Sequence, residues 1–514
     1  MPRTYLSILM TACFFVMSRC AFGSTHYIAA NGSDSNNGTS KTTPWLHAPG
    51  MPNCSSNCGS HTPVAGDQFV FRGGDTWHLG SSSATPYVGS GGWSWNWAGT
   101  VGNPIYVGVD QTWYSGDSWS RPILNGDNPL TTSPVSSCAH DESTLAFVSL
   151  NAANVIFDNF EFLGGCWHST QNGNGLCCLN YIAKGAPPNP VNIIIENTYM
   201  HGWSHVTFSC GNGGASGNCD GAQGISGDSH SNGGQGNVVQ NAVIDGSDSD
   251  PTSFSAVLWD CYDIHNTVIR YNSNGLVCNN MHTFHDNLIE YISESSDGQT
   301  HSNGFEFNSE WAGTNTVYNN LIRHITAAVS GWVNPSQTDY HFNNVVYDTI
   351  GQGWDVDPTG GGTNMYFYNN TIVGGGVGAS ASWEGVLNNN IFIKGGVTGS
   401  PKSNSNAINW TTTQAGNAGF TAANNYAPTS SNCNGNSPCP VGAGANLTSA
   451  CTTVSALCKD TTDACRYNIS DHTVTCPART TVARPSSGAW DIAAYQYNAP
   501  RQPNPPTNLT ATAH

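Results

Sequence analysis

The chain has 514 residues, of which only 9% are charged, and its formal net charge is −18 at pH 7. Such an acidic surface repels nucleic acid and anionic membranes, so neither is expected as a partner. The chain is rich in Gly, Asn, Ser and Thr. These residues disfavour helix interiors and favour turns between strands, which argues against helical repeats.

The first residues resemble a secretory signal peptide. Arg3 precedes an apolar run from Leu6 to Met17, and Ala21 to Gly23 form a small-x-small cleavage site. We therefore predict that residues 1–23 are removed and that the protein is secreted to the extracellular space. No other long apolar stretch follows, so no membrane span is expected.

Residues 24–150 are predicted to form an N-terminal cap and early coils. Strands are expected near residues 68–72 and 104–109. Trp93, Trp95 and Trp97 alternate along one further strand, which places three indoles on one face. They form either a platform for sugar stacking or, as we favour, a cover over the end of the fold.

Residues 151–394 repeat one pattern, a polar anchor among β-branched and apolar residues, as in NVIFDNFEFLG and VYNNLIRHI. The anchors are Asn159, Asn197, Asn241, Asn266, Asp286, Asn319, Asn343, Asn369 and Asn389. Their spacing returns repeatedly to between 20 and 26 residues, which is typical of a solenoid. Strands this short must stack in register to bury their apolar side, so the pattern predicts an all-β parallel β-helix.

Residues 395–498 lose the strong repeat and gain cysteines, which predicts final coils and a stapled C-terminal cap. Residues 499–514 form a Pro-rich linker, and their end resembles the first strand of a fibronectin type III module. We expect this tail to be disordered in isolation.

Sixteen of the 18 cysteines remain after residues 1–23 are removed, an even number in an exported chain. Disulfides are therefore expected. The predicted local pairs are Cys54 with Cys58, Cys210 with Cys219, and Cys433 with Cys439. Cys451, Cys458, Cys465 and Cys476 should staple the C-terminal region in a connectivity that the sequence leaves open.

Beyond the repeats, three segments carry a resemblance: HYIAANGSDSNNGTSKTTPW from His26, GDQFVFRGGDTW from Gly66, and SGAWDIAAYQY from Ser487. With the repeats, they resemble the secreted right-handed parallel β-helix proteins of the pectate lyase-like superfamily. The resemblance implies a right-handed β-helix. It does not imply one activity, since that superfamily includes polysaccharide lyases, glycoside hydrolases, carbohydrate esterases and phage tailspikes.

Catalytic signatures of particular families are missing. Polygalacturonase-like hydrolases carry Asn-Thr-Asp, Asp-Asp, Gly-His-Gly and Arg-Ile-Lys motifs, and none of the four is intact here. Pectate lyases typically use an Arg or Lys base beside calcium-binding Asp residues, and the repeats hold few basic residues.

Aligning the repeats predicts columns of stacked residues about 4.8 Å apart. Four positions after the anchors, the charges alternate through Asp245, Arg270, Glu290 and Arg323. We favour a solvated ion ladder for this column. The alternative is a lyase site in which Arg270 or Arg323 binds uronate or removes a proton.

A second column aligns AVLWDC, GLVCNN, GFEFNS, GWVNPS and GWDVDP. Strand alternation then predicts an acidic outer strip with one aromatic residue. Its members are Asp260, Glu306, Asn308, Trp332, Asn334, Asp355 and Asp357. Two other interpretations stay open: an internal asparagine ladder, or a structural calcium ion held by Asp355 and Asp357.

The acidic strip suits a long polymer. Glu306 and Asp355 lie two coils apart, so their backbones should be roughly 9.6 Å apart, close to the carboxyl separation of inverting glycosidases. We predict an extracellular polysaccharide-cleaving enzyme in which these two acids share the acid and base roles. Asp260, Asp357 and His301 are predicted to assist.

The predicted substrate contacts are Trp332, Asn308, Asn334, Arg270 and Arg323. A calcium-assisted lyase is the first alternative, with Arg270, Arg323 or His301 as the base. A non-catalytic glycan-binding adhesin is the second. We expect a monomer whose partner is a polysaccharide, and calcium is the one cofactor that the sequence suggests.

Overall fold

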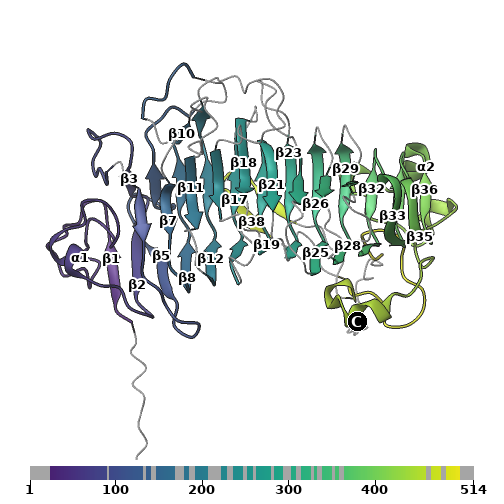
Figure 1. Ribbon diagram of the computed structural model, residues 1–514, viewed down its shortest axis with the longest axis horizontal. Coiled ribbons are helices and arrows are strands. Elements are labelled where there is room, and N and C mark those ends of the chain that lie inside the picture. Colours follow the sequence, from purple (N-terminus) through teal and green to yellow (C-terminus); the bar gives the residue numbers. More distant parts are fainter. Residues whose placement is uncertain are drawn as a thin grey trace, which may run out of the picture.

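The chain forms an elongated stack of parallel strands that runs from its N-terminal region to its C-terminal region (Figure 1). The computed structural model describes residues 23–89, 92–130, 135–140, 146–167, 179–184, 191–205, 222–227, 236–246, 252–258, 262–278, 283–292, 303–307, 314–325, 329–332, 338–349, 354–357, 364–458, 465–475 and 482–497. Residues 1–22 of the predicted signal peptide and the predicted C-terminal tail, residues 499–514, lie outside these ranges, so both predictions stay untested.

The strands form three parallel faces, each a ladder in which every strand pairs with its counterpart in the next coil. Face 1 consists of β4 (Trp93–Trp95), β7 (Ala146–Leu150), β11 (Leu179–Lys184), β15 (Ala222–Ser226), β18 (Thr252–Leu258), β21 (Asn272–Cys278), β24 (Phe305–Phe307), β27 (Val329–Trp332), β30 (Trp354–Asp357), β33 (Val377–Asn388) and β35 (Val397–Ser405). The long strands β33 and β35 continue into the next face and join the two faces.

Face 2 follows face 1 in each coil. It consists of β1 (Thr25–Ile28), β2 (Gln68–Gly73), β5 (Ile105–Tyr114), β8 (Val155–Asp158), β12 (Ile193–Glu196), β16 (Val238–Gln240), β19 (Asp263–His265), β22 (Thr283–His285), β25 (Thr314–Tyr318), β28 (Thr338–Phe342) and β31 (Asn364–Tyr368), and it ends in β33 and β35.

Face 3 completes the coil. It consists of β3 (Thr76–His78), β6 (Ile123–Asn125), β9 (Glu161–Leu163), β13 (Tyr199–His201), β17 (Val243–Asp245), β20 (Val268–Arg270), β23 (Leu288–Ile292), β26 (Leu321–Ile325), β29 (Val345–Thr349), β32 (Thr371–Val373), β34 (Ile391–Ile393) and β36 (Ile408–Trp410). Three stacked parallel faces make the fold a right-handed parallel β-helix, as predicted.

The anchor residues make the turn between faces 2 and 3. All nine have a left-handed backbone, with φ between 52° and 69°. Among residues with a side chain, Asn and Asp tolerate this conformation best, which explains why they recur at this position. In each repeat a face 2 strand ends just before the anchor, and a face 3 strand begins two residues after it.

Apolar columns and one polar column fill the interior. Buried side chains such as Phe157, Ile195 and Phe284 stack along the inside of face 2. Directly after five of the anchors, asparagines form a buried ladder whose successive side-chain amides bond at 3.0 to 3.1 Å. These residues are Asn287, Asn320, Asn344, Asn370 and Asn390. The ladder gives each buried amide a hydrogen-bond partner, and without such partners the buried amides would destabilise the fold.

Both ends of the stack are covered. At the N-terminal end lie α1 (Ser56–Ser60) and the loops around it, and Trp93 and Trp95 are buried in the core. These two indoles therefore pack inside the fold, in line with the cover that we favoured. At the C-terminal end, α2 (Thr412–Asn417) and four short 3₁₀ helices lead to the segment that contains Trp490. The 3₁₀ helices span Ala422–Asn424, Cys433–Gly435, Thr448–Thr452 and Ser455–Cys458.

Two further pairings lie beside the three faces. β10 (Cys166–Trp167) pairs with β14 (Ser204–His205) in parallel, and β37 (Arg466–Asn468) pairs with β38 (Thr473–Thr475) as an antiparallel hairpin. Within the described ranges, no helix is long and apolar enough to cross a membrane.

Disulfides join segments in both caps and between the early coils and the first repeat. The predicted pairs Cys54–Cys58 and Cys433–Cys439 are confirmed, and Cys451 bonds to Cys458. Cys138–Cys166, which closes a separation of 28 residues, was not predicted. The predicted pair Cys210–Cys219 lies outside the described residues. Several disulfides in one chain are typical of an oxidising compartment.

Candidate functional site

The predicted acidic strip falls on face 1. Glu306 in β24 pairs with Ser330 in β27, and Ser330 pairs with Asp355 in β30. Glu306 and Asp355 therefore occupy one column, two strands apart, as the sequence predicted. Phe305, beside Glu306, is fully buried. Strand alternation assigns positions 306 and 355 to the opposite face from the core.

The predicted alignment of β27 is wrong by two residues. Trp332 pairs with Asp357, whereas Ser330 takes the position between Glu306 and Asp355. A shift of two preserves the face on which a residue lies, because strand side chains alternate with a period of two. Trp332 thus stays on the predicted face but lies beside Asp357. A serine, not an indole, lies between the two predicted acids.

Three members of this strip, Asp260, Asn308 and Asn334, lie outside the described residues, as does the assisting residue His301. For Glu306, Trp332, Asp355 and Asp357 the structure describes the strand positions, and their side chains lie outside the described part. The catalytic, substrate-binding and calcium-binding roles of all these residues remain predictions.

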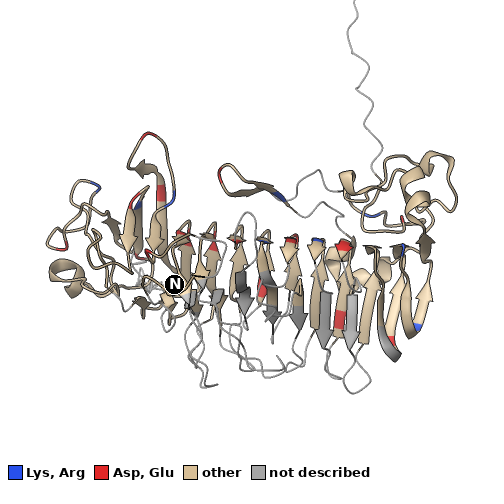
Figure 2. Ribbon diagram, turned by 90° about the horizontal axis from the view of Figure 1, so that it is seen from above, with Lys and Arg blue, Asp and Glu red and all other residues tan. Residues whose placement is uncertain are grey.

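The alternating charges form a column on face 3, in the predicted register. Asp245 pairs with Arg270, Arg270 with Glu290, and Glu290 with Arg323. Arg270 Nη1 lies 3.6 Å from Asp245 Oδ2, and its Nε lies 3.3 Å from Glu290 Oε1. Arg323 Nη2 lies 2.7 Å from Glu290 Oε2. Figure 2 shows red and blue alternating along this edge of the stack.

This ion ladder is buried and not solvated as we had expected. Asp245, Arg270 and Glu290 are each less than one-tenth exposed. The β37–β38 hairpin covers part of the ladder, and its Tyr467 lies under the Arg270 guanidinium, 4.9 Å from ring centroid to Cζ. The cover explains the burial that the strand pattern alone did not predict.

The two arginines are held as cations. Burial alone would lower the pKa of Arg323, but Glu290 and Tyr347 outweigh it, so the pKa lies above its usual value. Burial also lowers the pKa of Arg270, but Asp245 and Glu290 together outweigh burial. The pKa of Arg270 is therefore raised as well. A raised pKa makes an arginine harder to deprotonate, which disfavours either one as a proton-removing base.

A third polar column, on face 2, was not predicted. It holds the residue directly before each of the first six anchors: Asp158, Glu196, Gln240, His265, His285 and Tyr318. We call these six residues the face 2 strip. The column lies one position before the anchors, so the alignment that predicts the face 3 column also contains it.

Two acids lie on adjacent coils at the N-terminal end of this strip. Asp158 is 8% exposed, and its oxygens accept bonds from Tyr106 Oη at 2.7 Å and Asn197 Nδ2 at 2.7 Å. Glu196 accepts a 2.5 Å bond from Gln240 Nε2. Burial raises the pKa of Glu196, the Gln240 bond opposes this, and Asp158 adds to it, so the pKa lies above its usual value.

Two histidines continue the face 2 strip. The rings of His265 and His285 stack with centroids 4.8 Å apart. His265 Nδ1 lies 3.0 Å from Asp263 Oδ1, and its Nε2 lies 2.9 Å from Gln240 Oε1. His285 Nδ1 lies 2.7 Å from Asp286 Oδ2. Three of these four ring nitrogens thus have a close hydrogen-bond partner.

The two ends of face 2 differ in what surrounds them. Next to Asp158, a hollow of about 520 Å³ is lined by Tyr27, Val70, Tyr106 and Asp110, among others. At the other end Phe342 and Tyr368 are buried in a cluster with Trp490 from the C-terminal cap. Tyr318, the last residue of the face 2 strip, packs against this cluster and stacks on Phe342 with ring centroids 4.8 Å apart.

Comparisons with known proteins identify no family. No family model matches the chain, and no curated protein matches it. The chain is similar to the solved structure of a GH136 lacto-N-biosidase from Eubacterium ramulus, at 11% identity and a TM-score of 0.45, covering 76% of this chain and 68% of that one.

Two polysaccharide lyases are also similar. Pectate lyase Pel9A matches at 15% identity and a TM-score of 0.37 over 93% of this chain and 97% of that one. A rhamnogalacturonan lyase matches at 17% identity and a TM-score of 0.40 over 75% of this chain and 87% of that one. Matches at these levels of identity and TM-score assign no activity to this chain.

Proposed function

We propose that the protein is an extracellular enzyme that cleaves a neutral or weakly charged polysaccharide by hydrolysis. In this proposal Glu306 and Asp355 divide the proton-donor and base roles on face 1. The observation that carries it is the register, in which Glu306, Ser330 and Asp355 share one column. The two acids are two strand spacings apart, so their backbones are separated by roughly 9.6 Å. This is near the carboxyl separation that inverting glycosidases use to admit a water.

The surroundings of this column favour a long substrate. A parallel ladder repeats the same position in every coil, so a polymer that lies along face 1 meets one residue per coil. The residue between the two acids in this column is Ser330, and a serine side chain is small, which is compatible with a sugar and a water between the acids. Trp332 and Asp357, paired with each other in the next column, are proposed to contact the sugar beside the cleaved bond.

The net charge also favours a substrate of low charge. Removal of residues 1–23 takes two basic residues, Arg3 and Arg19, and leaves 13 basic against 33 acidic residues. Such a surface repels a polyuronate unless a cation intervenes. Arg270 and Arg323 could provide positive charge, but their guanidinium groups are paired with Asp245 and Glu290. This supports hydrolysis over a lyase mechanism with an arginine base.

The face 2 acids are a weaker alternative. Asp158 is almost fully buried, and its carboxylate already accepts bonds from Tyr106 and Asn197. A base that must reach a substrate needs an accessible oxygen. We therefore assign the reaction to face 1.

A panel of glycans incubated with the purified protein tests the reaction class. Hydrolysis predicts new reducing ends without ultraviolet absorbance, whereas β-elimination would give products that absorb through a new double bond. Unchanged activity after treatment with a chelator is expected for hydrolysis without calcium. Loss of activity with the chelator, restored by calcium, would instead support the lyase with Asp355 and Asp357 as calcium ligands. Binding without any turnover would favour the adhesin.

A further inference from the structure

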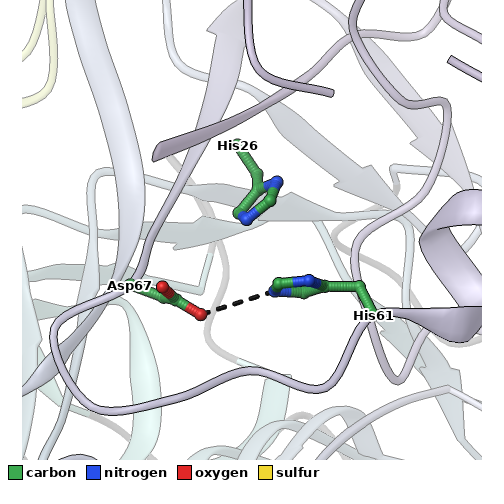
Figure 3. Close-up of side chains that lie close together, drawn as sticks. All are labelled: His26, His61 and Asp67. Carbon is green, nitrogen blue, oxygen red and sulfur yellow. Dashed lines mark ion pairs between the residues drawn. The ribbon is translucent and has the colours of Figure 1, made fainter. Parts of the chain in front are cut away.

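Three segments of the N-terminal region bring two histidines and an aspartate together (Figure 3). His26 lies in β1, the first strand of face 2. Asp67 directly precedes β2, the next strand, and His61 lies in the loop that joins α1 to β2. One ligand atom from each residue lies within 4.8 Å of those of the other two.

His26 is buried in a way that its protein contacts do not satisfy. The residue is 5% exposed, and neither ring nitrogen has a hydrogen-bond partner in the described part of the chain. Its ring stacks on Trp45 with centroids 4.5 Å apart and lies 5.4 Å from Phe69. A buried polar nitrogen without a partner is unfavourable, so such a group calls for an explanation.

Asp67 is a buried carboxylate that is held in place. It is 1% exposed, and its oxygens accept bonds from the backbone N–H groups of Ser24 at 2.7 Å and Val64 at 2.9 Å. Its Oδ2 lies 3.4 Å from His61 Nε2, and this nitrogen has no hydrogen bond among the described residues. Backbone bonds of this kind orient the carboxylate ligands of metal sites.

We propose that His26, His61 and Asp67 bind a divalent transition-metal ion, with zinc as the best-suited probe. Two imidazole nitrogens and one carboxylate oxygen form a donor set that suits zinc and its neighbours and not calcium or magnesium, which prefer oxygen. Ligands at roughly 2.0 to 2.1 Å from a tetrahedral zinc ion are about 3.4 Å apart. The separation of His61 Nε2 from Asp67 Oδ2 matches this value.

The ion would act as a staple for the first coil. It would join β1, β2 and the loop after α1, close to the Cys54–Cys58 disulfide. One edge of β1 pairs with β2, and the other is covered only by the cap segment that contains Gly38 and Trp45, so a cross-link at that point stabilises the end of the stack. A metal that binds only the folded chain raises its stability by mass action.

Zinc titration of the full chain, without a histidine tag, tests the proposal. After metals are removed with a chelator, calorimetry with ZnCl₂ should detect tight binding, and zinc should raise the melting temperature. CoCl₂ should give the visible absorption of a coordinated ion. Asp67→Asn and His26→Phe should each weaken zinc binding at least about 10-fold, as expected when a metal ligand is lost.

The cluster of Asp263, His265 and His285 provides the matched control, because it is the other group of metal-ligand residues in the described ranges. His265→Gln should leave tight zinc binding and the thermal shift unchanged. If His26→Phe does not fold, His61→Gln replaces it, since the His61 side chain is 23% exposed and tolerates substitution better. Wild-type zinc affinity in both His61→Gln and Asp67→Asn, or no zinc binding by the wild type, would overturn the proposal.

Discussion

Two columns of the same repeat differ in the order of their charges: one alternates acids with arginines, and the other places two acids side by side. Four positions after the anchors, on face 3, acids and arginines alternate, so each charge has a partner above or below it. One position before the anchors, on face 2, two acids, Asp158 and Glu196, are neighbours, and no basic residue lies between them. Alternation stabilises a buried column, whereas at Glu196 burial raises the pKa and the neighbouring charge of Asp158 adds to that rise.

This difference shows where a β-helix can carry function. A column that neutralises itself holds the coils together and leaves no charge for a ligand. A column of like charges, or one with a small residue between two acids as on face 1, leaves charged groups without an opposite charge. Such groups can act on a ligand, but they lower the stability of the fold.

Substitution of one arginine in the ion ladder should lower the free energy of unfolding strongly. Arg270→Gln leaves Asp245 and Glu290 buried without their shared cation, and loss of one partner of a buried pair lowers the free energy of unfolding by about 3 to 5 kcal/mol. Chemical denaturation measures this loss. Lys402→Gln is the control, because its pair with Glu384 is exposed and should show no measurable change. Equal effects of the two substitutions would contradict the buried ladder.

The asparagine ladder should come next. Asn344 donates to Val317 O and Asn370 Oδ1, and its own Oδ1 accepts from the Asn320 side chain. Asn344→Ala removes these bonds, so we expect a loss of about 2 to 4 kcal/mol in the free energy of unfolding. Asn409→Ala, at an exposed strand position, should change it by less than about 0.5 kcal/mol. A ladder position that tolerates alanine as well as residue 409 does would be evidence against the ladder.

The like-charge neighbours should give a smaller effect that depends on pH. The folded-state pKa of Glu196 is raised, so folding binds a proton and the wild type loses stability as pH rises from the usual glutamate pKa through the folded value. Glu196→Gln removes this loss. The variant should therefore be slightly more stable than the wild type at neutral pH, and the difference should vanish in acid. Melting curves between pH 3 and about 8 measure it; a difference that grows in acid has the wrong sign.

The sequence predicts the fold well because the repeat is local. Each anchor is an Asn or Asp at a fixed place in the repeated pattern, and all nine adopt the left-handed backbone that favours these residue types. The register of the face 3 column follows directly from them. No anchor lies near Trp332, and there the predicted pairing is wrong by two residues. Side chains of a strand alternate with a period of two, so a shift of two leaves the pattern of inward and outward residues unchanged.

The sites are harder to predict because they depend on contacts between distant segments. The cover over Arg270 comes from Tyr467, and the Cys138–Cys166 bond crosses 28 residues. His26 and Asp67 lie in two segments that we singled out as a resemblance, yet nothing in either segment indicates that their side chains meet. The register of the face 2 strip, by contrast, can be predicted from the sequence, because its residues stand one position before the anchors.

The most direct test of the account compares turnover by Glu306→Gln with turnover by Glu196→Gln on the glycan that the wild type cleaves. Loss of a general acid or base should lower the rate of Glu306→Gln by about 100-fold or more. Glu196→Gln, on face 2, should keep the wild-type rate. If the rate instead falls in Glu196→Gln and survives in Glu306→Gln, the reaction takes place on face 2 and the account is wrong.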